Sequence, residues 1–311
     1  MTLTKTINHP VMWPPPLKPG DLLAVVAPAS PVDRDLFAAG AGILENWGFR
    51  LAHGPEIFAS RPYQPAADLE VWQYFRQALM NQEISGIICA RGGYGTLRIL
   101  EHLDLTMLAA HPKYLIGFSD ITNLLCLFSQ HAGLVTFHGP TVAHLGEITA
   151  PARDQYYRML TSPSADLVSF HDLQVLSPGL ARGPLIGGNL TTLCSLVGTP
   201  YALPLAGKVL FVEDHNEAPY RLDRMLQQLR LSGSLTGIKA IILGSFTCCG
   251  DTTEVWEIFA ALGDSLKIPV LAGLPAGHQP DNFTLPIGAK VEVDANNRTV
   301  SLKDPVFLQH P

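Results

Sequence analysis

The sequence has no long apolar run and no cluster of basic residues. None of its stretches reaches the roughly 18 to 20 consecutive apolar residues that a membrane-spanning helix needs. The net charge is −6, from 21 Lys and Arg against 27 Asp and Glu. Without a Lys/Arg block, neither nucleic acid nor an anionic membrane is expected as a partner. A small molecule or a peptide is the better match for such a surface.

Signals for export and for disulfides are also missing. Residues 1–19 are polar and then proline-rich, without the apolar core of a secretory signal, so we expect a cytoplasmic location. The cysteines are odd in number and show no C-x-x-C spacing, which indicates neither a disulfide framework nor a zinc knuckle. These residues, expected to be reduced thiols, are Cys89, Cys126, Cys194, Cys248 and Cys249.

The sequence does contain enough apolar residues for a large core. Its 311 residues are 47% hydrophobic, a length and composition typical of two domains. In the first half, short apolar runs alternate with helical segments, which predicts a parallel sheet covered by helices. Strands are expected at Leu22–Ala27, Ile84–Ala90 and Tyr114–Gly117. We therefore predict an open α/β domain over residues 1–165.

A second, smaller α/β domain is expected over residues 183–311. Residues 166–182 lose the periodic pattern and collect Ser, Pro and Gly, which indicates a linker. The second domain has apolar runs at Lys208–Val212 and Ile238–Gly244 that predict strands. It ends in a predicted β-hairpin within residues 289–302, whose Asn-Asn tip suits left-handed turn geometry.

The segment Tyr114–Thr122 carries the clearest functional signal. An apolar run stops at a Gly-Phe-Ser-Asp turn and continues directly into a helix predicted over residues 121–132. Such a turn projects the Ser119 hydroxyl above the sheet, beside free N–H groups that can stabilise an oxyanion. Ile121 occupies the place where a G-x-S-x-G nucleophile elbow has its second glycine. The alternative is that Ser119 only caps the helix.

Other reactive groups also follow predicted strands. Ligands of open α/β sheets bind beyond the carboxyl ends of the strands. The glycine-rich turn Arg91–Gly95, Ser119, Glu213 and His278 all come shortly after apolar runs. A nucleophile, a glycine-lined turn, a carboxylate and an imidazole are the components of acyl-transfer catalysis, and the order Ser, Glu, His occurs in known hydrolases.

Each of these groups has a structural alternative. His278 is one of eleven histidines and could be an ordinary loop residue. The alternative for Glu213 is an ion pair with Arg221 or Arg224, and Asp214 and Glu217 compete for its role.

The glycine turn could instead hold a nucleotide phosphate. Its spacing is not G-x-G-x-x-G, however, and no Walker lysine follows it. The acidic cluster from Glu213 to Glu217 has no H-E-x-x-H spacing to support a metal. A non-catalytic, nucleotide-binding α/β protein therefore stays open as an alternative of another class.

Several spaced segments together resemble the LD-carboxypeptidases, serine peptidases that include muramoyltetrapeptide carboxypeptidases and microcin-immunity peptidases. The resemblance extends from about Leu17 to Leu302 and departs from the family at none of the site positions. The matching segments are Ala90-Arg-Gly-Gly-Tyr-Gly-Thr96, Gly117-Phe-Ser-Asp-Ile-Thr122, Gly187-Gly-Asn-Leu190, Phe211-Val-Glu-Asp-His-Asn-Glu-Ala-Pro-Tyr-Arg-Leu-Asp-Arg-Met-Leu226 and Gly273-Leu-Pro-Ala-Gly-His278.

The resemblance implies roles for individual residues. It implies Ser119 as nucleophile and Glu213 and His278 as the other members of a catalytic triad. Backbone N–H groups of Gly92, Gly93 and Asp120 would form the oxyanion hole. It further implies a flavodoxin-like first domain, a homodimer, and no metal or organic cofactor.

The reaction implied by the family is removal of the terminal D-alanine from murein tetrapeptides during cell-wall recycling. The substrate ends in a carboxylate, so a cationic or N–H-rich pocket is required, with Arg91 and the helix N-termini as candidates. The alternative for Arg91 is that it only braces its own turn, and Tyr94 is a further candidate for substrate binding. Within the family, hydrolysis of peptidyl or aminoacyl nucleotides in microcin immunity is the alternative.

Overall fold

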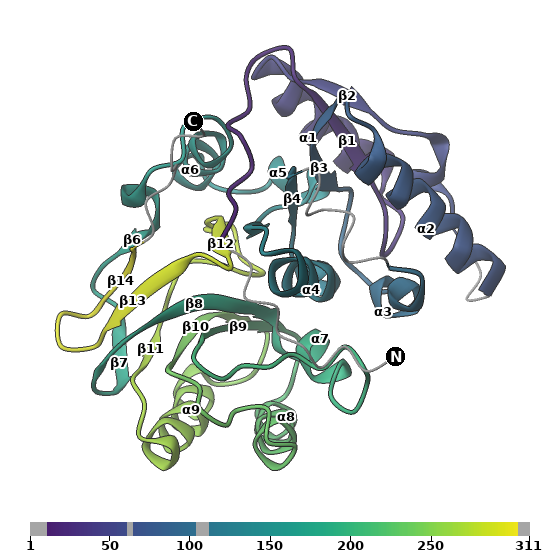
Figure 1. Cartoon of the computed structure of the whole chain (residues 1–311). Helices are drawn as coiled ribbons and strands as arrows, with labels where there is room; N and C mark the ends of the chain where they lie inside the picture. The colour runs from purple at the N-terminus through teal and green to yellow at the C-terminus, as the bar shows by residue number, and fades with distance from the viewer. Residues whose placement is uncertain (1–10, 61–64, 104–111, 304–311) are drawn as a thin grey trace.

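The computed structural model describes residues 11–60, 65–103 and 112–303, which form two β-sheets with helices packed on them (Figure 1). The first sheet has the order β12-β5-β4-β3-β1-β2, and its strands β2, β1, β3, β4 and β5 are all parallel. This 2-1-3-4-5 order is that of flavodoxin, so the predicted flavodoxin-like sheet is confirmed. The strands are β1 (Leu22–Val26), β2 (Arg50–Ala52), β3 (Ile84–Cys89), β4 (Tyr114–Gly117), β5 (Thr136–His138) and β12 (Leu285–Ile287).

Helices cover the faces of this sheet, and its aliphatic strands are therefore buried, β4 completely so. Local sequence fixes where the helices begin; at α1, the Asp33 side chain accepts hydrogen bonds from the N–H groups of Asp35 and Leu36. The α-helices are α1 (Arg34–Asn46), α2 (Pro65–Met80), α3 (Thr96–Ile99), α4 (Thr122–Ala132), α5 (Val142–Leu145) and α6 (Ala150–Thr161). Short 3-10 helices include η1 (Pro55–Phe58), η2 (Leu100–His102), η4 (Ser119–Ile121) and η5 (Ala165–Val168).

The second sheet has the order β6-β14-β13-β8-β9-β10-β11-β7, with β8, β9, β10 and β11 parallel at its centre. Helices α8 and α9 cover one face (Figure 1). The predicted C-terminal hairpin is present as β13–β14, but its left-handed residue is Arg298 (φ 59°) rather than either asparagine. The strands are β6 (Ser169–Phe170), β7 (Gln174–Ser177), β8 (Leu180–Asn189), β9 (Val209–His215), β10 (Ala240–Thr247), β11 (Val270–Ala272), β13 (Lys290–Asp294) and β14 (Thr299–Leu302). The helices are α7 (Leu190–Ser195), α8 (Pro219–Leu231) and α9 (Thr252–Leu266).

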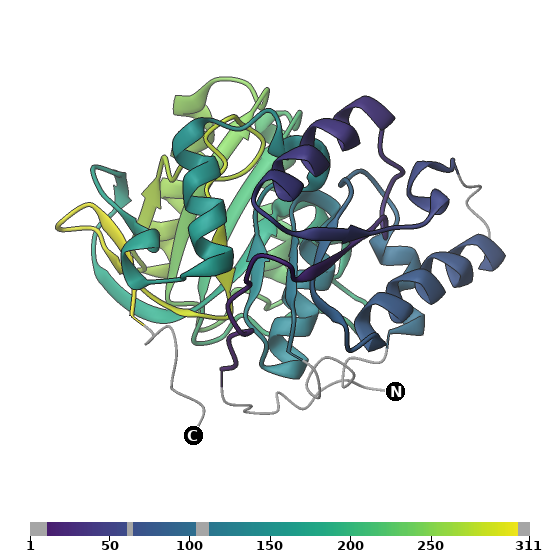
Figure 2. The same ribbon diagram turned by 90° about the horizontal axis from the view of Figure 1, so that it is seen from above.

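The two sheets lie side by side (Figure 2), and one strand from the C-terminal part of the chain belongs to the first sheet. Strand β12, from the C-terminal part of the chain, pairs antiparallel with β5 at the edge of the first sheet. Helix α4 lies between the sheets (Figure 1), and the Asn189 N–H at the end of β8 donates to Thr122 Oγ1 over 3.0 Å. No helix in the described ranges is long and apolar enough to cross a bilayer.

Candidate active site

Ser119 stands on a strained turn directly after β4. Its φ of 62° places a non-glycine residue in the left-handed region, which is sparsely populated and typical of functional turns. Neither η4 nor α4 receives a side-chain cap, so the alternative that Ser119 caps the helix is wrong. A Cβ on Gly117 would come within 2.9 Å of Ile121 Cγ2, which shows that this isoleucine packs where an elbow's second glycine would leave space.

The glycine-rich turn after β3 contacts Ser119 directly. A Cβ at Gly92 would lie 2.9 Å from Ser119 Cβ and 3.2 Å from its Oγ, so only glycine allows this approach. Ser30 holds the turn from the other side: its N–H donates to the Gly92 carbonyl (3.2 Å) and its Oγ accepts from the Tyr94 N–H (3.1 Å). These bonds do not use the N–H groups of Gly92 and Gly93.

Asp120 connects the serine turn with the glycine turn, a contact that sequence reasoning missed. Its carboxylate accepts from the Thr96 N–H (2.8 Å), and its carbonyl accepts from Thr96 Oγ1 (2.7 Å). Burial raises the pKa of Asp120, while these hydrogen bonds oppose the rise. With its carboxylate held in this way, Asp120 can offer its backbone N–H beside Ser119.

Glu213 and His278 are joined by a short hydrogen bond. His278 Nδ1 lies 2.6 Å from Glu213 Oε2, and the Glu213 side chain is fully buried. The expectation that Glu213 follows its strand was wrong, because pairing with β10 extends β9 to His215 and leaves Glu213 within the sheet.

Two rings and a backbone hydrogen bond hold the imidazole of His278 in place. The Phe118 ring lies 4.8 Å from it, and the exposed His215 ring stacks on it at 5.1 Å with an interplanar angle of 14°. Thr247 Oγ1 donates to the His278 carbonyl over 2.6 Å. Because Phe118 precedes Ser119, its ring contact brings the histidine loop of the second sheet to the serine turn of the first.

The environment of His278 favours its charged form. Burial opposes protonation, but the hydrogen bond and charge of Glu213, together with the charge of Asp214, outweigh it and raise the pKa of His278 above its usual value. Such a base accepts a proton readily and holds it while a negative charge develops nearby.

Two further histidines, neither of them a member of the predicted triad, lie near the Phe118 ring. His144 lies 4.9 Å from this ring, and His138 lies 6.0 Å from it. Burial lowers the pKa of both to about 4, so both are neutral near pH 7. His138 is fully buried, and neither of its ring nitrogens has a partner among the described residues. The sequence offers no local signal for them; His138 is the last residue of β5, and His144 lies on α5.

The competing carboxylates have other partners. Asp214 accepts from Asn189 Nδ2 (2.9 Å) and from the N–H and hydroxyl of Thr191 (both 2.9 Å). Glu217 pairs with Arg221 at 3.4 Å, so the proposed pairing of Glu213 with Arg221 is replaced by this one. Across residues 11–60, 65–103 and 112–303, no cluster of three His, Cys, Asp or Glu side chains is arranged to hold a metal ion.

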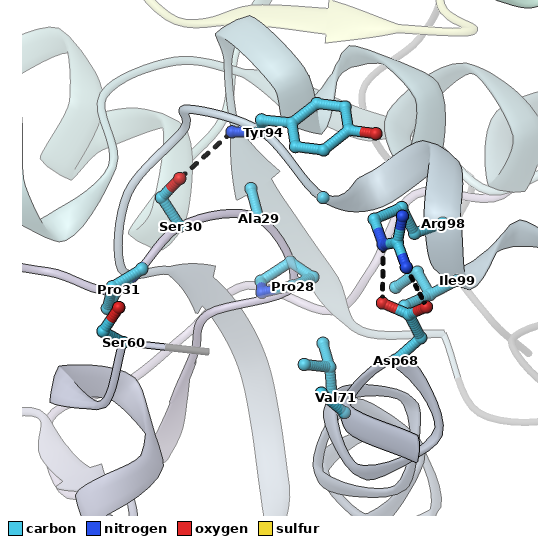
Figure 3. Close-up of a pocket in the computed structure, with 12 residues that line it drawn as sticks. Pro28, Ala29, Ser30, Pro31, Ser60, Asp68, Val71, Tyr94, Arg98 and Ile99 are labelled. Atoms are coloured by element: carbon cyan, nitrogen blue, oxygen red, sulfur yellow. Dashed lines mark hydrogen bonds and ion pairs between the residues drawn. The ribbon is translucent and has the colours of Figure 1, made fainter. Parts of the chain in front are cut away.

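A pocket of about 100 Å³ opens beside the glycine turn, between the carboxyl ends of β1 and β3 (Figure 3). In the flavodoxin strand order this is the topological switch point, where ligands bind. Tyr94 lines the pocket and is 46% exposed. Arg98 and Asp68 face each other at its side in a two-bond ion pair (2.7 and 2.8 Å), whereas Arg91 is exposed.

Comparisons with known proteins assign both halves of the chain to one family. A family model described as the LD-carboxypeptidase N-terminal domain matches residues 23–139, and one described as the C-terminal domain matches residues 182–293. A probable murein peptide carboxypeptidase of Bacillus subtilis is 32% identical, over 93% of this chain and 94% of that protein. The murein tetrapeptide carboxypeptidase of Pseudomonas aeruginosa is 36% identical, over 88% and 93%. The solved structure of the microcin C7 self-immunity protein MccF with aspartyl sulfamoyl adenosine has a TM-score of 0.82 and 26% identity, over 94% and 98%.

Proposed function

The chain belongs to the LD-carboxypeptidase family, and we propose that it removes the terminal D-alanine from murein tetrapeptides as a serine peptidase of cytoplasmic cell-wall recycling. The observation that carries the proposal is the 2.6 Å bond from His278 to the buried Glu213, next to the turn where Ser119 has left-handed backbone geometry and Phe118 contacts the His278 ring. A nucleotide-binding protein needs neither feature. The murein peptidases among the relatives support the substrate class.

In the proposed mechanism, Ser119 Oγ attacks the carbonyl before the terminal residue while His278 Nε2 takes its proton. Glu213 accepts from Nδ1–H, which keeps the ring in the tautomer that can act as base. Backbone N–H groups of Gly92, Gly93 and Asp120 stabilise the oxyanion, each by about 3 to 4 kcal/mol. His278 then protonates the leaving amine, D-alanine departs, and water hydrolyses the acyl-enzyme by the same proton route.

Arg91 is proposed to bind the substrate carboxylate. Both oxygens of Asp68 already hold the Arg98 guanidinium, so the cation at the pocket wall is neutralised. Arg91 begins the turn whose next residue contacts Ser119, and its side chain is exposed. Tyr94, at the pocket mouth, would then contact the side chain of the diamino acid.

A direct assay tests the function. The enzyme is incubated with a diaminopimelate-containing tetrapeptide and the products are weighed, with Ser119→Ala as control. Loss of one alanine by the wild type alone supports the proposal. Hydrolysis of an aminoacyl nucleotide with no action on the peptide would identify an immunity-type enzyme, and nucleotide binding without hydrolysis would identify a non-catalytic protein. We also propose a homodimer, for which sedimentation should give twice the mass of 33.7 kDa.

A further inference from the structure

One oxygen of the Glu213 carboxylate has no hydrogen-bond donor among the described residues. Oε2 accepts from His278, but Oε1 is buried without a partner. A buried carboxylate with one donor is unfavourable, because the desolvated second oxygen loses its bonds to water without replacement. A second donor should therefore lie within reach of Oε1.

A β-bulge places Ser245 beside this carboxylate. In the register of β9 with β10, the two residues Gly244 and Ser245 both stand opposite Glu213 alone. Bulges occur next to active sites, where they redirect a side chain that regular pairing would point elsewhere. The Ser245 Oγ is buried and, like Glu213 Oε1, has no partner among the described residues.

The loop that carries His278 closes over both oxygens. A Cβ on Gly277, whose φ is 117°, would lie 2.5 Å from Ser245 Oγ and 2.8 Å from Glu213 Oε2. The two groups therefore flank the same point, where only a glycine leaves room. The Ser245 N–H also donates to the Ala276 carbonyl over 2.9 Å, which ties the bulge to this loop.

We propose that Ser245 is a positioning residue whose hydroxyl donates to Glu213 Oε1, after rotation about its Cα–Cβ bond or through one ordered water. This inference rests on the proposed function and extends its triad by one residue. The hydroxyl contacts neither Ser119 nor substrate. Its role is to fix the carboxylate plane, so that Oε2 stays aligned with Nδ1–H and His278 keeps the tautomer that accepts a proton.

Loss of the Ser245 hydroxyl should change the pKa of His278 in a predictable direction. An unsolvated carboxylate with fewer donors binds a positive partner more strongly, so the pKa of His278 should rise further above its usual value. The other titratable groups that face His278 are Asp214 and His215 on β9, His138 at the end of β5, and His144 on α5. None of them is changed by a substitution at Ser245.

The test compares Ser245→Ala with Ser245→Thr, which keeps a hydroxyl. Ser129→Ala is the matched control, because it removes another buried serine hydroxyl, one bonded to the Ile287 carbonyl. For Ser245→Ala we expect kcat to fall about tenfold or more, the size of a lost bond to a buried charge. KM should stay near the wild-type value, and the acid midpoint of kcat/KM should move to higher pH. Ser245→Thr and Ser129→Ala should both behave like the wild type.

A substrate-free measurement separates this proposal from the proposed function. The ring of His278 is titrated by NMR in wild type and Ser245→Ala, with its signal assigned by its absence in His278→Ala. An upward shift supports the positioning role even if no murein peptide is cleaved. An unchanged midpoint in Ser245→Ala would overturn it, and so would a Ser245→Thr variant as impaired as the alanine variant.

Discussion

Replacing Glu213 by glutamine should remove the charge of the triad and keep its shape. A carboxylate and an imidazolium about 4 Å apart attract each other by about 4 kcal/mol at an effective dielectric constant of 20. The full burial of Glu213 means that solvent does not screen this attraction. At 1.36 kcal/mol per decade, the lost charge alone slows the reaction by about a thousandfold. The glutamine amide can also donate to Nδ1, which leaves the proton on Nε2, where His278 can no longer act as base.

We therefore expect Glu213→Gln to lower kcat by about 10⁴, with KM little changed. The assay is release of D-alanine from the tetrapeptide, with circular dichroism and thermal unfolding to confirm an intact fold. Glu217→Gln is the control, because this carboxylate comes four residues later and pairs with Arg221. The reasoning is refuted if Glu213→Gln keeps a tenth of wild-type turnover, or if the control is equally impaired.

Further predictions concern the nucleophile, the oxyanion turn and the histidines. Ser119→Ala should lower kcat by several orders of magnitude with folding intact, and adding His278→Ala should cost little more, because the residues act as one unit; additive losses would contradict this. In a pH profile of kcat/KM, activity should fall on the acid side with a midpoint above about 6.5, since the base must be neutral and Glu213 raises its pKa. A midpoint below 6 would be inconsistent with the hydrogen bond between His278 and Glu213. Gly92→Ala should cost about a hundredfold in kcat by displacing Ser119, and no loss would exclude the close approach. The pKa of His138 is lowered from 6.5 to about 4 in the folded protein. As pH falls through this range, the unfolded chain binds a proton that the folded chain does not, and the folded state loses stability. Between pH 8 and pH 5, His138→Phe should therefore lose about 2 kcal/mol less free energy of unfolding than the wild type, as measured by urea unfolding. Equal losses in the two proteins would refute this.

The fold of the first sheet could be predicted because its signals are local. Buried parallel strands are short aliphatic runs, and each is followed by a turn and a helix, as at Tyr114–Gly117. The C-terminal hairpin was predicted for the same reason. The left-handed residue at its tip was not, because the choice between Asn297 and Arg298 depends on the register of the pair rather than on intrinsic preference alone.

The candidate site could be located from the sequence but not completed. Ser119 and the glycine turn have local signatures, and the rule for strand ends directed attention to Glu213 and His278. Asp214 and Glu217 could be set aside only once Asn189, Thr191 and Arg221 were seen to bind them. Those contacts join elements far apart in the chain, and hydrophobic periodicity carries no information about them.

The bulge at Ser245 shows why the remaining polar contacts escape sequence analysis. An extra residue in one strand changes the face to which the following side chains point, yet it leaves the apolar pattern of β10 almost unaltered. A strand prediction ending at Gly244 therefore places Ser245 in a loop, whereas the structure keeps it in the sheet opposite Glu213.

Strand β12 changes how the two halves of the site are held together. It lies in the first sheet, although it follows His278 by only seven residues, while β11, before His278, lies in the second. The segment that carries His278 is therefore anchored in the second sheet at one end and in the first sheet, beside β5, at the other. A three-residue strand gives no detectable periodicity, so this double anchorage could not be predicted. It has a functional consequence, because a base fixed to both sheets keeps its position relative to Ser119 even though the serine and Glu213 belong to different sheets.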